Sequence, residues 1–396
     1  MKKFLSLLLL IPLLALLLPG KVEAAPVTIN VYNWGQYIAD GTDDSLDVIA
    51  AFEEAYPNIK VNYMTFDSNE SMYTKLKTGG SSYDIIIPSD YMIEKLISED
   101  LLEPLNFDNI PNYSYIDDSF KNLGHDPENR YSVPYTWGCV GIIYNTRFVR
   151  EEDATGWELL WNPTYAGKIL MFDNCRDAFA IAQFEQGDDI NTNAPAILER
   201  AAEKLREQKP LVQGYVMDQI YAKMERGEAW VAPYYAGDYL QMVQENPDLA
   251  FLFPEEGFNL FVDAICIPKG AEHKAEAETF INFLLEPEIC GQNLEFLGYS
   301  APETAAKEFM DPENAENPIA YPSAETLSRG VIFNALSVEG TQAMNNLWLT
   351  VKTNDDSTTR TLILTGIALA SAVALWAVLK VRSRRRKAGR CRKWRA

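Results

Sequence analysis

The stretch TINVYNWGQYI, residues 28–38, sets the pattern for the whole chain. Aliphatic residues alternate along its first half, as in a buried strand that opens a globular domain. A strand of this kind usually turns away through Gly, Asn or Asp, but here Trp34, Gln36 and Tyr37 lie in the turn. Two large aromatic side chains and an amide at the end of the first strand indicate a loop that does more than connect two elements.

Strand and helix signals alternate outward from this stretch. The next segments are SLDVIAAFEEAYP (45–57), IKVNYMTF (59–66), NESMYTKLKTG (69–79), YDIIIPS (83–89) and YMIEKLISEDLLEPL (91–105). The first of them places apolar residues at helical spacing, and the second and fourth are typical of strands. The order strand–helix–strand–helix–strand–helix predicts an α/β domain with a largely parallel sheet.

A second set of signals begins at YSVPYTWGCVGIIYN, residues 131–145. It continues through KILMFDN (168–174), APAILERAAEKLREQK (194–209), AWVAPYYAGDYLQMV (229–243), FVDAICIPKG (261–270) and AEAETFINFLLEPE (275–288). The 396 residues suffice for two domains with hydrophobic cores. No repeat, low-complexity linker or Pro/Gly-rich spacer divides the two halves.

The charge of the chain is strongly acidic, with 35 basic and 56 acidic side chains and a net charge of −21. Ten of the basic residues lie in 380–395 alone, so the central part of the chain is more acidic still. Nucleic acid is therefore excluded as an expected partner, and a cationic ligand is favoured. Solubility alone would explain the same excess of Asp and Glu.

Both ends of the sequence are typical of an exported, membrane-attached protein. Residues 1–24 combine a Lys pair, a Leu-rich segment and small residues, which predicts a signal peptide. Residues 361–379 carry no charge, which predicts a transmembrane helix, and the basic tail 380–396 is expected in the cytoplasm. A buried globular helix is the alternative for 361–379. We therefore expect an extracytoplasmic body (periplasm or outer face of the cell membrane) anchored by this C-terminal helix.

Cysteine and histidine offer little material for metal or covalent chemistry. Cys139, Cys175, Cys266 and Cys290 would lie outside the cell, but their spacing matches no zinc or redox motif, and their pairing stays open. The chain has only two His residues. We expect no cofactor and no metal.

Candidate binding residues follow the predicted strands, because ligands of open α/β sheets bind outside the carboxyl ends of strands. They are Trp34, Gln36 and Tyr37; Ser89, Asp90 and Tyr91; Asp173, Asn174, Arg176 and Asp177; and Tyr235 and Asp238, while Phe261 and Asp263 flank the start of the next strand. Singly, such residues often only cap helices or pack edges. Together, carboxylates and aromatic faces suit an organic polycation, whose ammonium groups pair with acids and whose methylenes lie on rings.

Several strings of this sequence resemble the spermidine/putrescine-binding proteins of ABC importers. They are YNWGQYI, SNESMYTKLKTGGSSYDIIIPSDY, YSVPYTWGCVGIIYN, WELLWNPTYAGKI, PEEGFNLFVDAICIP, FINFLLEPE and LGYSAPE, and they extend over residues 27–352. The resemblance implies a two-lobed periplasmic binding protein fold with an interlobe cleft, in which the chain crosses between the lobes more than once. The implied lobes are 27–135 with 263–302, and 136–262 with 303–352.

The resemblance also implies a binding site and a role. The residues that the resemblance implies as binding the polyamine are Trp34, Gln36, Tyr37, Ser89, Tyr91, Asn174, Asp177, Tyr235, Asp238, Phe261, Asp263 and Tyr299. Gln36 and Asn174 stand where spermidine-selective relatives carry acids, and Phe333 stands where they carry a Gln. The implied function is extracytoplasmic binding of putrescine or spermidine by a monomer that delivers it to the permease of an ABC transporter. The choice among polyamines stays open.

Three other functions are alternatives for this sequence. A ferric-ion binding protein of the same fold would use Tyr234 and Tyr235 as phenolate ligands, although alternation along a strand would put one of them in the core. An enzyme is disfavoured because the chain has no Gly-x-Ser-x-Gly, His-Glu-x-x-His or P-loop motif. A membrane-anchored polyamine sensor or adhesin is the third alternative.

Overall fold

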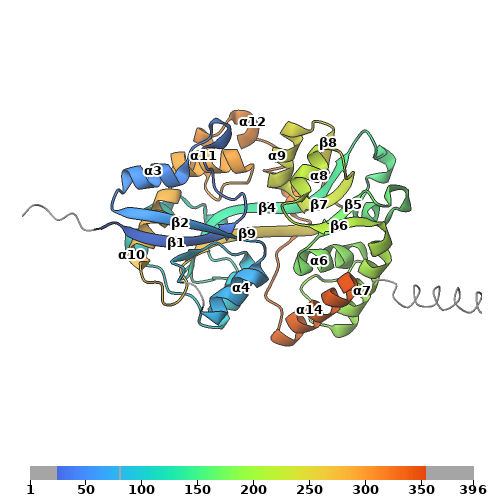
Figure 1. Ribbon diagram of the computed structural model, residues 1–396, viewed down its shortest axis with the longest axis horizontal. Coiled ribbons are helices and arrows are strands. Elements are labelled where there is room, and N and C mark those ends of the chain that lie inside the picture. Colours follow the sequence, from blue (N-terminus) through green and yellow to red (C-terminus); the bar gives the residue numbers. More distant parts are fainter. Residues whose placement is uncertain (1–24, 80–81, 354–396) are drawn as a thin grey trace, which may run out of the picture.

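The computed structural model describes residues 25–79 and 82–353, and its strands form one sheet that extends through two lobes (Figure 1). The strands are β1 Val27–Trp34, β2 Ile59–Phe66, β3 Ile85–Ile86, β4 Ser132–Asn145, β5 Ile169–Phe172, β6 Val212–Val216, β7 Val231–Tyr235, β8 Leu249–Leu252, β9 Phe258–Cys266 and β10 Gly330–Val331. The α-helices are α3 Val48–Ala55, α4 Asn69–Thr78, α5 Asp90–Ser98, α6 Cys175–Glu185, α7 Pro195–Gln208, α8 Ile220–Glu225, α9 Ala236–Glu245, α10 Lys274–Leu284, α11 Pro287–Leu297, α12 Pro312–Ala315, α13 Ala324–Leu327 and α14 Val338–Thr353.

The first lobe is built on β2, β1 and β3, which run parallel to one another. Its helices begin where the sequence supplies caps: Asp47 accepts a hydrogen bond from the backbone of α3, and Ser68 forms a capping box with Ser71 at α4. Helix α3 buries Phe52, whose ring centroid lies 4.8 Å from that of Phe280 in α10. Burial of such a ring stabilises the lobe by about 1.5–3 kcal/mol.

Two long strands join the lobes (Figure 1). Strand β4 pairs antiparallel with β9 through its first half, from Ser132 to Cys139, and with β7 through its second half, from Val140 to Tyr144. A third connection follows α13, where β10 pairs with the start of β9. The chain therefore crosses between the lobes more than once, as the resemblance implied.

The expected largely parallel sheet is only partly correct. The strand order is β2-β1-β3-β9-β4-β7-β5-β6, and the pairs at both ends are parallel. The central pairs β3·β9, β9·β4 and β4·β7 are antiparallel. The sheet is mixed because β4 and β9 cross between the lobes in opposite directions, which no short sequence window reveals.

The expected boundary between residues 302 and 303 also differs from the structure. The 3-10 helix Thr304–Phe309 packs on α11 of the first lobe, and Ala306 is buried in that lobe's core. Ser300 Oγ donates to the Ala320 carbonyl, so the chain is still in the first lobe there. The crossing to the second lobe comes later, between α12 and α14, because the strand β10 lies in that interval.

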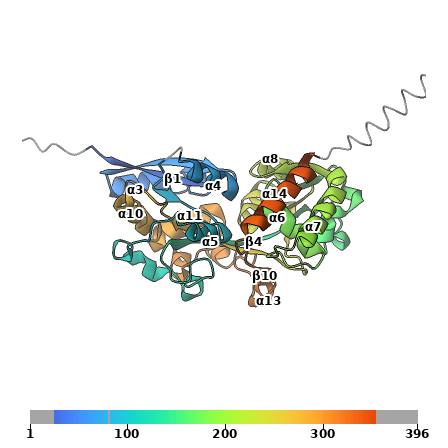
Figure 2. The ribbon, with the colours of Figure 1, turned by 90° about the horizontal axis from the view of Figure 1, so that it is seen from below.

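The second lobe contains β5, β6, β7 and β8 with helices on both faces of the sheet (Figure 1). Helix α14 packs against α7 and α6, as Figure 2 also shows. The ring of Trp348 in α14 meets those of Phe179 and Tyr215 edge-on. The last described helix thus completes the core of the second lobe.

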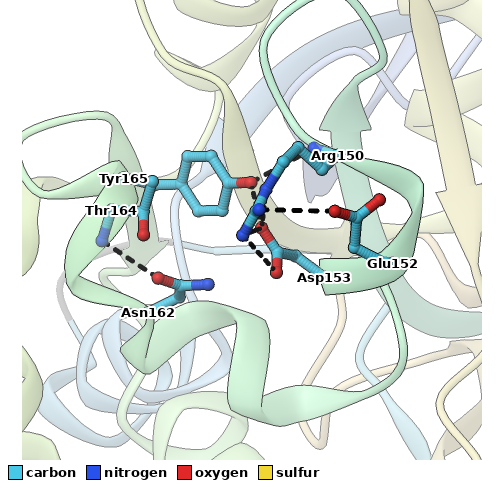
Figure 3. A network of polar contacts seen from close by, with 6 residues as sticks. All are labelled: Arg150, Glu152, Asp153, Asn162, Thr164 and Tyr165. Atoms are coloured by element: carbon cyan, nitrogen blue, oxygen red, sulfur yellow. Dashed lines mark hydrogen bonds and ion pairs between the residues drawn. The ribbon is translucent and has the colours of Figure 1, made fainter.

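The string WELLWNPTYAGK, residues 157–168, has a structural role in the loop between β4 and β5 (Figure 3). Tyr165 OH donates to Asp153 Oδ2 at 2.5 Å and accepts from the Arg150 backbone at 3.1 Å. Arg150 also forms a two-pronged ion pair with Asp153, and Asn162 caps the following turn. An exposed ion pair of this kind adds little stability, so the main effect of the network is to hold the shape of the loop.

Three predictions concern segments that lie outside the described residues. They are the signal peptide 1–24, the transmembrane helix 361–379 and the basic tail 380–396. Within residues 25–79 and 82–353, no helix is both long enough and apolar enough to span a membrane. In the same residues the four cysteines are buried free thiols.

Candidate functional site

A cavity lies between the two lobes, at the strand ends that the sequence singled out. It encloses about 690 Å³ of space, part of it open to solvent. Its walls are Trp34, Gly35, Tyr37, Phe66, Asp67, Asn69, Ser89, Asp90, Tyr91, Asn174, Asp177, Met217, Asp218, Tyr234, Tyr235, Asp238, Asn259, Phe261, Asp263, Tyr299 and Phe333.

The walls of the cavity are acidic and aromatic. Six aspartates and nine aromatic residues line it, and no Lys, Arg or His does so among the described residues. An anionic ligand would be repelled there, because no basic side chain of the lining neutralises the carboxylates. A ligand with ammonium groups separated by apolar methylenes matches both kinds of wall.

Asp263 reaches the cavity from the middle of β9. It is 5 % exposed, and its Oδ2 accepts a hydrogen bond of 2.7 Å from Tyr37 OH. Thr136, its cross-strand partner in β4, contacts the same hydroxyl at 2.6 Å. Oδ1 is buried and has no partner among the described residues. Burial raises the pKa of Asp263 to about 6, so a cation at Oδ1 would stabilise its charged form.

Asp177 lies in the first turn of α6, where the helix N-terminus favours a negative charge. Its Oδ2 accepts hydrogen bonds from Asn174 at 2.6 Å and from Tyr235 OH at 3.0 Å. Burial raises its pKa to about 7, and Asp263 also raises it through charge repulsion. Asn174 is at the same time the cap of α6, since its Oδ1 accepts from the Arg176 backbone.

Asp238 lies in the first turn of α9 and links the two lobes. It accepts a hydrogen bond of 2.5 Å from Tyr221 OH within the second lobe, and a second one from Tyr299 OH of the first lobe. Nearby, Gln241 Nε2 donates to the carbonyl of Leu297 at 2.9 Å. Burial raises the pKa of Asp238 to about 6. These cross-lobe bonds hold the lobes together over the cavity.

Aromatic residues of the lining pack against one another around the carboxylates, and three such pairs lie on different sides of the cavity. Their ring centroids lie 4.6 Å apart for Trp34 and Phe66, 5.5 Å for Tyr235 and Phe261, and 5.8 Å for Tyr91 and Phe333. Trp34 Nε1 is buried without a partner among the described residues. Such a wall covers a hydrocarbon chain and attracts a cation at the ring faces.

Two glycines allow the lobes to meet closely at the cavity. A Cβ added to Gly237 would lie 2.4 Å from the ring of Tyr299, and one added to Gly35 would lie 2.4 Å from Asp218 Oδ2. Both contacts are between lobes, so a larger residue at Gly237 would force the rigid ring of Tyr299 away. At Gly35 only the end of an Asp side chain has to move.

The structure brings eleven of the twelve expected site residues to this cavity, and Gln36 is the exception. Gln36 is exposed and lies instead in a separate depression with Thr42, Tyr221 and Gln244. Its φ of 51° is left-handed, and the tight turn after Trp34 sends its side chain away from the cavity. The expected position of Gln36 in the site is therefore corrected.

Sequence reasoning missed seven residues of the lining altogether. They are Phe66, Asp67, Asn69, Met217, Asp218 and Asn259, with Gly35 in the first loop. The rule of strand ends would have found Asp67 and Asn69, which follow the recognised strand 59–66. Met217 and Asp218 follow β6, whose sequence VQGYV was not recognised as a strand because Gln and Gly interrupt its apolar pattern.

The alternative of a ferric site at Tyr234 and Tyr235 finds little support. Both contact the cavity, but Tyr234 is 2 % exposed and belongs to the hydrophobic core, as alternation along the strand predicts, whereas Tyr235 is partly exposed. Burial raises the pKa of each hydroxyl well above its ordinary value. The described residues also hold no group of three or more His, Cys, Asp or Glu side chains suited to a metal.

Comparisons with known proteins agree with this geometry. The model of the family described as bacterial extracellular solute-binding protein matches residues 47–322. The spermidine/putrescine-binding periplasmic protein of Escherichia coli is 33% identical over 304 residues, which cover 76% of this chain and 85% of that protein. The putrescine-binding periplasmic protein PotF of the same organism is 29% identical over 352 residues, covering 84% and 93%.

A solved structure shows the same likeness in three dimensions. The spermidine/putrescine ABC transporter substrate-binding protein PotD of Streptococcus pneumoniae superposes with a TM-score of 0.69 at 36% identity. The superposition covers 82% of this chain and 98% of that one.

Proposed function

Because this chain belongs to the family of bacterial extracellular solute-binding proteins, we propose that it binds a polyamine, putrescine or spermidine, in the cleft between its lobes. It then delivers the polyamine to the permease of an ABC transporter. The similar proteins are named for binding the same compounds, and none of those compared above is named as an enzyme.

The observation that carries this proposal is the composition of the cavity walls. Asp177, Asp238 and Asp263 are carboxylates in largely buried positions, and no basic side chain of the lining opposes them. Burial raises the pKa of each, which means that the charged form of each carboxylate is destabilised when no ligand is bound. Ammonium groups would remove that cost by pairing with them, and the rings would cover the methylenes between.

Calorimetry tests the proposal directly. We expect the full chain, purified in detergent, to bind putrescine or spermidine with a Kd of about 1 μM, roughly −8 kcal/mol. Lysine and arginine are the matched controls, because each carries a carboxylate that the acidic cleft should reject. Absence of heat and of any thermal shift with every polyamine would refute the proposal.

Closure of the lobes gives a second test. Asp263 and Tyr37 come from the first lobe, and Asp177 and Tyr235 from the second, so one ligand would bridge both. A ligand that contacts both lobes favours the closed state by its differential affinity. Small-angle scattering should then report a smaller radius of gyration with polyamine than without it.

The membrane attachment is a separate part of the proposal and rests on the sequence alone. Residues 361–379 are uncharged and precede a strongly basic tail, which supports an extracytoplasmic body anchored at its C-terminal side. Removal of residues 354–396 should release the protein from the membrane fraction without loss of polyamine binding. A truncated protein that stays in the membrane fraction would contradict the anchor. A sensor with the same ligand would bind polyamine but support no uptake by a transporter.

A further inference from the structure

An exposed aromatic pair lies at the end of the second lobe that faces away from the cavity. The ring of Phe148, which is 44 % exposed, stacks on the partly exposed ring of Trp230 with centroids 4.6 Å apart. Lys168 Nζ lies 5.1 Å from the centroid of the Trp230 ring, and the guanidinium of Arg147 lies 5.9 Å from that of Phe148. Aromatic side chains with Lys or Arg beside them are typical of the interface between lipid and water.

The topology of the sheet separates this pair from the cavity. Trp230 directly precedes β7 and Lys168 directly precedes β5, and these two strands are parallel. Phe148 follows the end of β4, which runs antiparallel to β7. The other ends of β7 and β5 bring Tyr235 and Asn174 to the cavity. The aromatic pair and the cavity are therefore at opposite ends of the strands of the second lobe.

Two further cations connect this part of the lobe to the end of α14. Lys209, shortly before β6, donates from Nζ to the carbonyls of Val351 at 3.0 Å and Lys352 at 2.8 Å. Arg206 donates to Thr350 Oγ1 at 3.0 Å. The partners of both cations in these bonds are neutral, so their charges are available to a further group.

Acidic side chains accompany the cations, and the net charge of this surface is small. Arg147 pairs with Asp248 at 3.4 Å, and Glu207 and Glu228 are exposed. An exposed pair such as Arg147 and Asp248 is weak. A partner of this surface therefore has to gain from the rings, or be held close by the chain itself, and not only from charge.

The chain supplies such a connection to a lipid bilayer. Helix α14 runs from the side of the cleft toward the far end of the second lobe (Figure 2), and Leu349, one turn before its end, is 60 % exposed. Seven residues, 354–360, separate this helix from the uncharged stretch 361–379. Seven residues span at most about 25 Å when fully extended. An anchor in a bilayer therefore keeps the end of α14 within that distance of the anchor.

We propose that the end of the second lobe opposite the cavity lies on the lipid surface, with the rings of Phe148 and Trp230 among the headgroups. Lys168 and Lys209 then face lipid phosphates. This inference rests on the proposed membrane attachment and adds which surface of the body meets the lipid. The second lobe is the lobe held at the membrane, its cavity lies at the end away from the lipid, and closure moves the first lobe.

Quenching by lipid tests this proposal on the full chain. Cys391→Ser removes the thiol of the basic tail, and the other four cysteines are buried, so one introduced cysteine takes a fluorophore. Glu228→Cys places the fluorophore two residues from Trp230, and Glu308→Cys, at an exposed residue of the first lobe, is the matched control. The vesicles contain equal parts of phosphatidylcholine and phosphatidylglycerol and a lipid with a nitroxide at its headgroup. Quenching should be at least threefold stronger at position 228 than at position 308.

Removal of one ring tests whether the aromatic pair makes the contact. Phe148→Ser, with the fluorophore kept at position 228, should reduce quenching at least twofold. Phe309→Ser removes a ring of the same 44 % exposure from the first lobe and should leave quenching at position 228 unchanged. Thermal unfolding of both variants should stay near that of the natural protein, because both rings are on the surface.

The outcomes separate this inference from the attachment on which it rests. Equal quenching at positions 228 and 308 in vesicle-bound protein would overturn the inference and leave the anchor intact. The same holds if a folded Phe148→Ser protein is quenched as strongly as the natural one. A full chain that does not stay with the vesicles would refute the membrane attachment itself. None of these results changes the calorimetric test of polyamine binding.

Discussion

The carboxylates that the two lobes bring to the cavity are held in different ways. Asp177 and Asp238 of the second lobe lie in the first turns of helices, and each accepts hydrogen bonds from two side chains. Asp263 lies in a strand, accepts a side-chain hydrogen bond from Tyr37, and keeps Oδ1 buried without a partner. Asp177 and Asp238 thus each have a helix N-terminus and two side-chain donors, one of which, Tyr299, belongs to the first lobe, whereas Asp263 has one oxygen left for a group that enters the cleft.

Substitution of Asp263 is expected to have the largest effect. Asp263→Asn keeps the shape and can still accept from Tyr37, but it removes the charge. Loss of one partner of a desolvated charge pair costs about 2–5 kcal/mol, so the Kd for putrescine should rise at least roughly thirtyfold in calorimetry. Thermal stability of the empty protein should not fall, because burial already disfavours the charged form of Asp263.

Asp67→Asn is the matched control for this substitution. Asp67 also lines the cavity, but it is exposed, and water can replace a lost partner there. The Kd of the Asp67→Asn variant for putrescine should change only a few fold. A destabilised Asp263→Asn protein with normal affinity would show instead that Asp263 only holds β9 in place.

The second largest effect on polyamine affinity is expected from lower pH, which should weaken binding. Burial raises the pKa of Asp177 to about 7 and those of Asp238 and Asp263 to about 6, and a bound cation favours the ionised forms. Binding then releases protons, so affinity should fall at least about tenfold from pH 8 to pH 6, mainly through Asp177. Asp177→Asn should flatten this profile between pH 8 and 6. A profile that is equally steep in the variant would contradict the assignment.

The stability of the empty protein should show the opposite trend. The folded-state pKa values of these three groups lie above the value of an unfolded aspartate, about 3.9. Between pH 4 and pH 7 the folded protein therefore binds more protons than the unfolded chain, and the contribution of these groups to stability falls as pH rises. Saturating polyamine should remove this loss of stability at higher pH. Thermal unfolding at pH 5 and pH 8, with and without polyamine, measures the effect.

A smaller effect is expected from the hydrogen bond between the lobes. Tyr299 and Tyr221 donate to the same carboxylate of Asp238, but only Tyr299 does so across the cleft. Tyr299→Phe should weaken putrescine binding by about two- to tenfold, as one hydrogen bond contributes about 0.5–1.5 kcal/mol. It should also enlarge the radius of gyration of the empty protein in small-angle scattering. Tyr221→Phe, the control, should leave that radius unchanged, and equal radii in both variants would refute a role in closure.

The fold could be predicted from the sequence as far as local patterns extend. Alternating strands and helices predicted the α/β class, and the rule of strand ends found Asp177 and Asp238, whereas Asp263 lies within β9 and was expected from its place at the start of a predicted strand and from the resemblance. The antiparallel centre of the sheet and the late crossing after Ala320 could not be found in this way, because they depend on pairing between distant segments such as β4 and β9. The strand β6 was missed because its polar and Gly residues hide the apolar alternation.

Gln36 shows that sequence patterns also do not predict the direction in which a side chain points within a turn. A residue just after a strand is brought to the edge of the sheet, but its φ and ψ angles decide which way its side chain points. The left-handed conformation of Gln36 sends its side chain out of the cavity, while Trp34 and Tyr37 on either side of it line the walls. Sequence resemblance places such a residue in a site without showing that turn.

Gln36→Glu is therefore expected to have the smallest effect of all. An acid that faced the cleft would improve spermidine binding relative to putrescine by pairing with a further ammonium group. An exposed acid outside the cavity is screened by water and salt, so both Kd values should change less than twofold. Asn174→Asp is the matched comparison, since Asn174 lies inside the lining and an acid there should shift the ratio toward spermidine. A shift with Gln36→Glu as large as with Asn174→Asp would mean that the turn after Trp34 rearranges when ligand binds, so that the first loop and not only the second lobe selects the polyamine.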